Sequence, residues 1–420
     1  MIAVSLLLVL LALLGAPLFA IIAAGALISF ISIDPELGIA VPIEIFSIAE
    51  MPILLAIPLF TFAGYLLSES QAPGRLVRLT SAVLGWMPGG LAIVSIGACA
   101  FFTAFTGASG VTIIALGAIL YPALAQAGYD DRFNLGLVTA GGSLGLLFAP
   151  SLPLILYGVV AEVNIDDLFI AGILPGMLML LSLSAYALWM NRGNRVPLKD
   201  FSWKEVGAAL LESVWELPLP LVVLGGIYSG LLAVSEAAAV TAVYVVLVEV
   251  VIRREIPLKK LPGIMRESMV LVGGILLILG ASLASTNYVI DAEVPQKLIG
   301  IVTNLVDSRV SFLFLLLLFL LVLGAFLDIF SALVLVVPLI LPVAAEYGVE
   351  PIHLGIVFLA TMQLGYLTPP VGLNLFIASY RFNQPIVNVY LATIPFLLIL
   401  LAAVIVITFW PGLSLMLLSW

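Results

Sequence analysis

Long apolar runs separated by short polar segments cover almost the whole chain. A helix needs about 20 apolar residues to cross the ~30 Å hydrocarbon core of a bilayer. The first run is too long for the apolar core of a signal peptide, so we interpret it as a span. The pattern predicts nine crossing segments, at residues 3–31, 50–68, 133–162, 166–191, 215–232, 234–252, 268–288, 353–383 and 387–415. The expected fold is an all-α polytopic membrane protein.

Two further apolar segments, 89–126 and 310–346, each contain a weak point midway. The first is interrupted at residues 106–110 (Thr-Gly-Ala-Ser-Gly) and the second at residues 326–328 (Phe-Leu-Asp). Each segment is either one hairpin that enters and leaves by the same face, or two short spans. We favour two re-entrant helical hairpins, because halves of about 17 residues barely cross the core.

Helix-breaking residues recur along the chain at a constant separation of 220 residues. The matching pairs are Pro122 and Pro342, Gly128 and Gly348, Gly145 and Gly365, Pro150 and Pro370, and Pro175 and Pro395. Ordered agreement of this kind indicates an internal duplication. Because proline removes a helical hydrogen bond, segments 133–162 and 353–383 are predicted to be two discontinuous helices. Upstream, residues 72–84 and 294–306 match with a two-residue slip and are expected to form amphipathic helices along opposite membrane surfaces.

The basic residues give the spans an orientation. Thirteen of the 15 Lys and Arg residues fall on one side of the predicted topology, and only Lys297 and Arg309 fall on the other. The rule that basic loops stay inside makes that side cytoplasmic. Hairpin 89–126 then enters from the cytoplasm and hairpin 310–346 from the opposite face. The two copies are therefore predicted to form an inverted structural repeat.

This topology predicts how the chain divides. The hairpins and broken helices form two halves of a transport domain, and the remaining segments form a scaffold with two arms. The predicted boundaries are 1–88 for the first scaffold and arm segment, 89–162 for the first transport half, 163–309 for scaffold spans and the second arm, 310–383 for the second transport half, and 384–420 for the last scaffold span.

Composition narrows the class of protein further. Apolar residues make up 63% of the 420 and charged residues only 9%, against about 25% charged in soluble domains. The net charge of −9 does not indicate a nucleic-acid partner, because the few charges lie in the predicted loops. Cys99 stands alone, so it forms no internal disulfide, and we interpret it as buried filler. The sequence contains no nucleotide-binding loop, haem-ligand pair, metal cluster or catalytic triad, and we expect no enzyme activity.

Broken helices free backbone carbonyls that need a partner inside a membrane. The carbonyls around Gly145 and Phe148 are predicted to be unpaired acceptors. Carbonyl and hydroxyl oxygens suit Na⁺, and the N-termini of half-helices attract anions. We predict that each hairpin tip meets the break of its own copy and that each unit holds one cation. The first site would use Thr106, Gly145, Phe148 and Pro150, and the second Phe326, Gly365, Thr368 and Pro370.

Four polar residues lie between these predicted sites and are the candidates for substrate binding: Ser109, Ser151, Asp328 and Asn374. Asp328 has a second interpretation as the N-cap of the returning hairpin arm. Glu236 is expected to help open span 234–252 as part of a cap. His353, the only histidine, is expected near a surface, with a proton-relay role as the less favoured interpretation.

Several of these motifs together resemble a known family. They are Gly107-Ala-Ser-Gly110, Gly145-Leu-Leu-Phe-Ala-Pro-Ser-Leu-Pro153, Ser235-Glu-Ala-Ala-Ala239, Phe326-Leu-Asp328 and Gly365-Tyr-Leu-Thr-Pro-Pro-Val-Gly-Leu-Asn374. The chain resembles, over essentially its whole length, the large membrane (M) subunit of tripartite ATP-independent periplasmic (TRAP) transporters. Two departures concern the first copy: Ala149-Pro150 stands where a Pro-Pro pair is usual, and the tip at 106–110 has fewer serines.

The resemblance implies a multi-pass protein of a bacterial or archaeal inner membrane. It implies Na⁺-driven import of an organic acid, such as a dicarboxylate or a sialic acid, by an elevator-type movement of the hairpin domain. It also implies two partners: a periplasmic substrate-binding protein, and a small four-helix membrane subunit on a separate chain. One alternative is a stand-alone Na⁺-coupled dicarboxylate or anion transporter without a binding protein. Another, a membrane anchor of a redox or sensory complex, is disfavoured because haem ligands and cysteine motifs are missing.

Overall fold

The computed structural model of the chain describes residues 7–8, 10–11, 14–87, 89–192 and 201–419, and no strand occurs among them. Within this part, seven helices are long and apolar enough to cross a bilayer, or up to nine spans if each of two bent helix pairs counts as one. The seven are Pro52–Glu69, Ile165–Met190, Val234–Ile252, Leu261–Asp291, Arg309–Phe326, Ile329–Glu346 and Ile386–Phe409. The prediction of an all-α polytopic membrane protein is confirmed.

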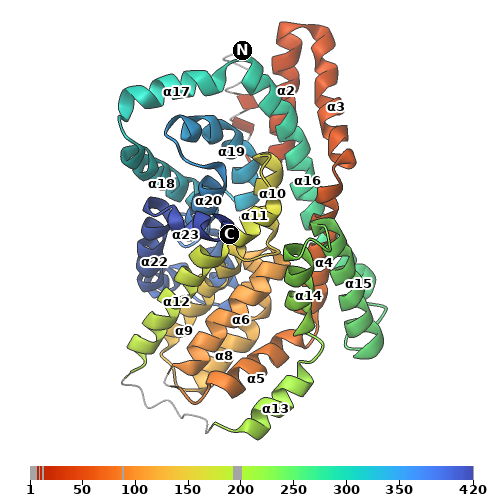
Figure 1. Cartoon of the computed structure of the whole chain (residues 1–420), viewed down its shortest axis with the longest axis vertical. Helices are drawn as coiled ribbons and strands as arrows, with labels where there is room; N and C mark the ends of the chain where they lie inside the picture. The colour runs from red at the N-terminus through yellow and green to blue at the C-terminus, as the bar shows by residue number, and fades with distance from the viewer. Residues whose placement is uncertain (1–6, 9, 12–13, 88, 193–200, 420) are drawn as a thin grey trace.

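One side of the molecule is built around the long helix α16 (Leu261–Asp291), which packs on α2 (Leu18–Ile33), α3 (Ala40–Ser47) and α4 (Ala56–Glu69). Helix α15 (Val234–Val246) lies against α4 and continues into a π-helical turn at Leu247–Ile252. In Figure 1 these helices form a column along the long axis of the molecule.

The rest of the molecule contains the segments that the repeat pattern singled out. The first set is α6 (Gly90–Thr106), α7 (Ser109–Ala115), α8 (Gly117–Gln126), α9 (Asp131–Gly141), η4 (Leu144–Leu147) and α10 (Leu152–Val160). The second set is α18 (Arg309–Phe326), α19 (Ile329–Glu346), α20 (Pro351–Gly365) and α21 (Leu373–Phe382). Helices α11 (Ile165–Ala171), α12 (Ile173–Met190) and α22 (Ile386–Phe409) pack around them.

Helix bounds follow the 220-residue register closely. Helices α6 and α18 end at residues 106 and 326, α7 and α19 begin at 109 and 329, and α9 and α20 begin at 131 and 351. The interruptions predicted in 133–162 and 353–383 are present, and the first bends the chain by 44°. The amphipathic segments form α5 (Ala72–Leu84) and α17 (Val294–Leu305), which lie at opposite ends of the molecule (Figure 1).

Several predicted spans differ from the observed helices. No helix runs unbroken from 3 to 31, because Gly15 adopts a left-handed turn and α2 begins only after Pro17; residues 1–6, 9 and 12–13 lie outside the described part. Segment 215–232 contains only α14 (Pro218–Tyr228), which at 1.5 Å per residue is about 16 Å long and too short to span. Both arms of the second hairpin have 18 residues, so length alone does not separate a hairpin from two spans.

Each interrupted helix packs against the first arm of the hairpin in its own copy through glycine. A Cβ atom on Gly145 would lie 2.5 Å from the Ala104 amide nitrogen, and one on Gly365 would lie 2.5 Å from the Cα of Gly324. Positions 104 and 324, like 145 and 365, are 220 residues apart. The same backbone contact therefore recurs in both copies and fixes each helix break beside a hairpin tip.

This contact predicts that Gly145→Ala destabilises the fold. The added methyl would also lie 2.2 Å from the Ala100 carbonyl oxygen, so the backbone of α6 must move, at a cost near the upper end of the ~1–3 kcal/mol typical of overpacking. Thermal unfolding of the purified protein in detergent measures the effect. Gly141→Ala is the matched control, because its Cβ would meet only Cys99 at ordinary contact distance. Equal unfolding temperatures for the two variants would contradict the packing argument.

Candidate functional site

The tip of the first hairpin meets the first helix break through threonine hydroxyls. Thr103 Oγ1 lies 2.8 Å from the Gly142 carbonyl oxygen, to which it donates, and 2.8 Å from Thr112 Oγ1. The predicted ion ligand Thr106 is fully buried, and its Oγ1 lies 3.5 Å from Thr112 Oγ1. Thr103 and Thr112 were missed in the sequence, although Thr103 and Thr106 share one helix face, since residues three apart are neighbours.

The carbonyls at the first break have partners, which corrects the sequence expectation. The Gly145 carbonyl accepts from the Phe148 amide at 3.0 Å, and the Phe148 carbonyl accepts from the Ser151 amide at 3.0 Å. Short 3₁₀-type turns satisfy the backbone locally, as they commonly do where an α-helix ends. Each oxygen retains a second lone pair. Pro150 follows Ala149 through a cis peptide bond, as Pro370 follows Pro369.

The second hairpin tip meets the second break by different contacts. The Gly372 amide donates to the Ala325 carbonyl at 3.1 Å, and the Ile329 amide donates to the Tyr366 hydroxyl at 2.5 Å. Asp328 Oδ1 accepts from the amides of residues 330 and 331, at 3.0 Å each, so the carboxylate caps α19. The N-cap interpretation of Asp328 is confirmed, and a contact with substrate stays a prediction.

Of the residues predicted to bind the second cation, one is exposed and the other three already take part in hydrogen bonds. The Phe326 side chain is 59% exposed. Gly365 O accepts from the Thr368 amide at 2.9 Å, while Thr368 Oγ1 donates to the Leu364 carbonyl at 3.1 Å. Pro370 O accepts from the Tyr390 hydroxyl at 2.8 Å. A cation here would have to share or displace these contacts.

Two predicted substrate residues from different copies come into direct contact. Ser109, at the first hairpin tip, donates to Asn374 Oδ1 at 2.7 Å, because α7 packs on α21. Asn374 Nδ2 and Ser151 Oγ are buried and have no hydrogen-bond partner among the residues that the structure describes. Buried polar groups without a partner are costly, so these two atoms remain candidates for contact with a bound polar molecule.

A buried ion cluster that the sequence did not reveal joins helix α5 to the segment before α14 and to the π-helical turn after α15. The Arg75 guanidinium contacts three carboxylates: Glu216, with Nε to Oε1 at 2.6 Å, Glu249, with Nη2 to Oε1 at 3.4 Å, and Glu255. Arg75 lies in the segment 72–84 that was expected along a membrane surface, and its side chain is only 5% exposed. Glu249 could have been found, because a carboxylate within an apolar span is a functional candidate by default.

The cluster perturbs its titratable members. Burial opposes the charge on Glu255, yet its pKa lies below the usual value because the Gln71 amide and the Arg75 guanidinium stabilise the carboxylate. Burial likewise opposes the charge on Arg75, and its pKa is nevertheless raised by the hydrogen bonds and charges of Glu255 and Glu216. Arg75 of α5 therefore stays positively charged, and its ion pairs hold α5 to the neighbouring segments.

Glu236 and His353 are the two remaining residues with a predicted role. Glu236 Oε2 accepts from the Ala233 amide at 3.0 Å and so caps α15, as predicted. The His353 side chain is fully buried in the protein, and its ring nitrogens lie 3.2 Å from Ser414 Oγ and 3.3 Å from the Thr408 carbonyl oxygen; its position near a membrane surface stays a prediction. It joins α20 to the C-terminal helices.

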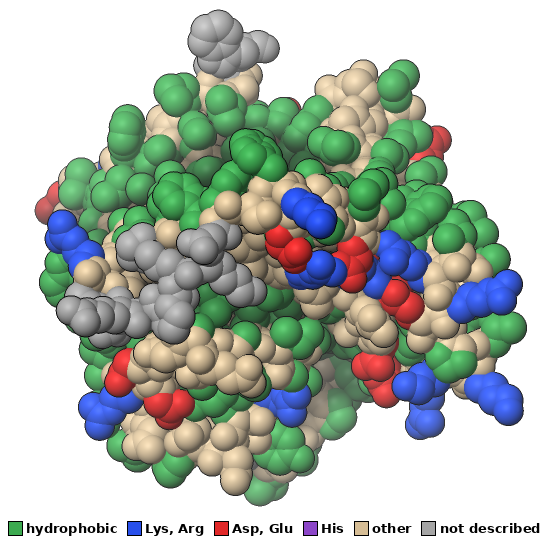
Figure 2. Space-filling view, turned by 90° about the horizontal axis from the view of Figure 1, so that it is seen from below, with side chains coloured by type: hydrophobic (Ala, Val, Ile, Leu, Met, Phe, Trp, Pro, Cys, Tyr) green, Lys and Arg blue, Asp and Glu red, His purple; other side chains and the backbone are tan. Residues whose placement is uncertain are grey.

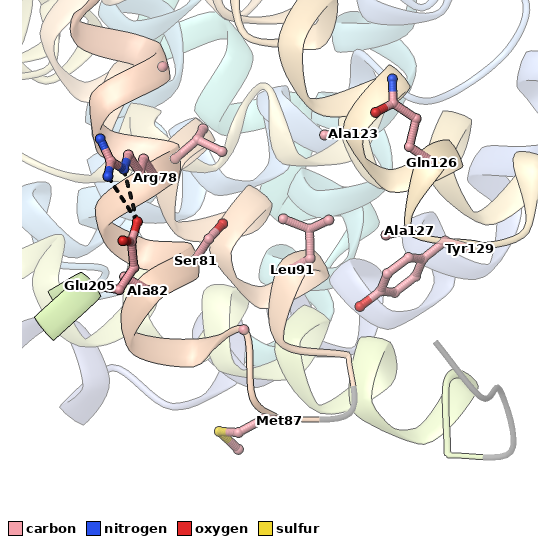
Figure 3. Close-up of a pocket in the computed structure, with 13 residues that line it drawn as sticks. Arg78, Ser81, Ala82, Met87, Leu91, Ala123, Gln126, Ala127, Tyr129 and Glu205 are labelled. Atoms are coloured by element: carbon pink, nitrogen blue, oxygen red, sulfur yellow. Dashed lines mark hydrogen bonds and ion pairs between the residues drawn. The ribbon is translucent and has the colours of Figure 1, made fainter. Parts of the chain in front are cut away.

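A cavity of about 570 Å³ lies apart from the predicted site. Figure 3 shows its lining, drawn from α5, the start of α6 and the end of α8, and from Glu205 of α13 (Trp203–Glu212), which pairs with Arg78. No predicted ion or substrate residue lines it. Among the described residues, no group of three or more His, Cys, Asp and Glu could hold a metal ion.

Apolar helices that enclose two broken segments, each met by a hairpin tip, define a multi-pass membrane protein with a polar interior, the arrangement typical of secondary transporters. Residues 4–413 match the family described as tripartite ATP-independent periplasmic transporter, DctM component. The chain belongs to this family, as its motifs predicted.

Relatives of known name support the assignment. The C4-dicarboxylate TRAP transporter large permease protein DctM of Pseudomonas aeruginosa is 34% identical over 94% of this chain and 93% of its own length. The isethionate TRAP transporter permease protein DctMQ of Oleidesulfovibrio alaskensis is 33% identical over 94% of this chain and 61% of its own length. These relatives are permeases and not enzymes.

A solved structure shares the fold. The YdaH transporter of Alcanivorax borkumensis superposes with a TM-score of 0.59 at 14% identity, covering 90% of this chain and 88% of that chain. At this identity the likeness concerns the fold alone.

Removal of the arm charge tests the ion cluster. Arg75→Gln leaves buried carboxylates without their cation, so we expect it to cost about 3–5 kcal/mol of stability, the range for breaking one side of a buried ion pair. Thermal unfolding in detergent measures it. Arg78→Gln is the matched control one helical turn away, because Arg78 pairs with Glu205 and Glu212 at the surface and its loss should matter far less. Similar losses in both variants would show that the Arg75 cluster has no special weight.

Proposed function

We propose that this chain is the membrane subunit that moves a small organic anion into the cell, driven by a Na⁺ gradient. The observation that carries the proposal is the buried contact between Ser109 and Asn374, which joins the tip of one hairpin to the broken helix of the other copy beside polar atoms without a partner. A substrate that replaces or joins this contact is held by both copies at once.

Two cation sites follow from the two hairpin and break units. The first unit offers the hydroxyl of Thr106 with the carbonyls of Gly145, Phe148 and Pro150, and the neighbouring Thr103 and Thr112 enlarge this set of neutral oxygens. The second unit offers the carbonyls of Phe326, Gly365 and Pro370 with the hydroxyl of Thr368. Neutral oxygens bind Na⁺ without creating a buried negative charge when the ion leaves.

The transport step is proposed to be an elevator movement of residues 89–162 and 310–383 against the scaffold. Helix bounds that repeat at 220 residues, arms at opposite ends of the molecule and the basic-residue bias support two inverted copies with re-entrant hairpins. Cation binding beside each tip would order the hairpin and couple the ion to the substrate.

The substrate class is an organic acid, of which a C4-dicarboxylate, a sialic acid or a sulfonate such as isethionate are the candidates. The named relatives carry a C4-dicarboxylate and isethionate. No basic side chain lies among the four substrate candidates, so the acid group would be met by hydroxyls, amide N–H groups and half-helix N-termini.

The partners proposed are a periplasmic substrate-binding protein and a small four-helix membrane subunit on a separate chain, with the assembly in a bacterial or archaeal inner membrane. The family description, one component of a tripartite periplasmic transporter, supports this set. The alternative of a stand-alone anion transporter makes a different demand, since it would need no binding protein.

Uptake into proteoliposomes tests the proposal. The chain is reconstituted with its small subunit, and C4-dicarboxylates, sialic acid and isethionate are offered with and without the binding protein, under an inward Na⁺ or K⁺ gradient. We expect uptake of one acid only with both Na⁺ and the binding protein. Uptake without the binding protein would favour the stand-alone transporter. Uptake under a K⁺ gradient would show that transport is not coupled to Na⁺.

The first cation site can be tested both by Na⁺ binding and by transport. Thr106→Val removes one hydroxyl while nearly keeping its shape, so we expect a several-fold higher Na⁺ concentration for both the Na⁺-dependent rise in unfolding temperature and half-maximal uptake. Thr139→Val is the control, because Thr139 is equally buried but bonds only to the Leu135 carbonyl within its own helix. An unchanged Na⁺ dependence in Thr106→Val would exclude this hydroxyl as a ligand.

A further inference from the structure

Helix α13 carries an exposed apolar face that neither the transport site nor the repeat explains. The helix runs from Trp203 to Glu212 between α12 and α14. Its exposed apolar side chains are Trp203 at 79%, Leu210 at 43% and Leu211 at 76%. Residues at positions i, i+7 and i+8 lie on one side of a helix, so these three form a single stripe.

The side of α13 away from the stripe packs on helix α5. Val206 and Ala209 are buried, and the two helices pack together. Glu205 and Glu212 both pair with Arg78 of α5, and Glu205 Oε1 accepts from Arg78 Nε at 3.1 Å. Arg78 thus offsets one of the two carboxylate charges of α13 and holds both side chains toward α5, and the apolar stripe points away from α5.

Aromatic rings from two separate segments extend the stripe. Phe201 makes edge-to-face contacts with Trp203, at 4.9 Å between ring centroids, and with Trp86, at 6.4 Å. Trp86 follows α5 and is 48% exposed, and its ring nitrogen donates to the Val83 carbonyl. Tryptophan at the edge of a membrane protein characteristically occupies the boundary between headgroups and acyl chains.

Charged side chains of both signs lie at this end of the molecule. Figure 2 looks at the lower end, where α5 and α13 lie, and shows Lys and Arg side chains interspersed with Asp and Glu. Lys204 is exposed beside Trp203. Basic residues beside an apolar stripe are typical of helices that lie in the plane of a membrane containing anionic lipids.

We propose that α13, with Trp86 and Phe201, is an interfacial anchor that lies in the headgroup boundary of the bilayer and holds arm α5 at the membrane surface. Arm α5 also lines the 570 Å³ cavity with α6 and α8 of the first hairpin. An anchored α13 would therefore keep that wall fixed when the hairpin moves. The inference does not depend on which solute or ion is carried.

Site-directed spin labelling tests the anchor. Cys99 is the only cysteine and is fully buried, so single cysteines can be introduced against a Cys99→Ala background. Labels at Trp203→Cys and Leu211→Cys probe the stripe. Ala208→Cys is the comparison, an exposed position of the same helix about 140° around the helix axis from Trp203. The full chain is placed in nanodiscs of phosphatidylethanolamine and phosphatidylglycerol, with and without its small subunit.

The readout is the collision rate of each label with oxygen, which partitions into lipid, and with a water-soluble nickel chelate. We expect the oxygen-to-nickel ratio to be several-fold higher at 203 and 211 than at 208. Equal ratios at the three positions would overturn the anchor. Protection of 203 and 211 from both reagents would mean that a protein covers the stripe, which also overturns it.

Discussion

A backbone that leaves the helical path inside a bilayer must find its hydrogen-bond partners within the protein, because lipid offers none. In this chain each of the two helix breaks satisfies that requirement within the protein. Short 3₁₀-type turns satisfy the carbonyls of Gly145 and Gly365 locally, and the same glycines allow the broken segments to touch the backbone of a hairpin arm. The hairpin tips are therefore placed at the breaks, and every feature of the candidate site depends on that placement.

The two copies use the same backbone contact with different side chains. The first is completed by threonine hydroxyls, and the second by the Tyr366 hydroxyl and the Asp328 carboxylate at the start of α19. Position 366 corresponds to Leu146, and 326 to Thr106. Two identical sets of side chains would make the region between the copies symmetric. Because the sets differ, this polar region is asymmetric: the first copy contributes Ser109 and the second Asn374.

The ion pairs of Arg75 and Arg78 lie away from this region and hold α5 to neighbouring segments. Arg75 of α5 binds three carboxylates, and Arg78 of α5 pairs with Glu205 of α13. Ion pairs in a site of low polarity are rigid, because separating them exposes an uncompensated charge. The first hairpin unit, in contrast, brings together neutral hydroxyl and carbonyl oxygens, and Asp328 is the charged residue at the tip of the second.

Much of the architecture could be read from the chain alone. Apolar run length predicted the helices, and the recurrence of Gly and Pro predicted where they break, since both rules act on local backbone geometry and on burial in lipid. The family followed from motifs at those same breaks. Local patterns also predicted the cap of α15, where Glu236 needs only its neighbours three residues away.

What the sequence alone could not supply depends on residues far apart in the chain. The contact between Ser109 and Asn374 joins positions 265 residues apart, and Arg75 meets Glu216 across 141. No periodicity records such a meeting, because it is decided by how helices pack after they form. The breaks illustrate the division. Sequence determined that Gly145 and Gly365 interrupt their helices, and only the tertiary structure decided which backbone they touch and which oxygens remain free.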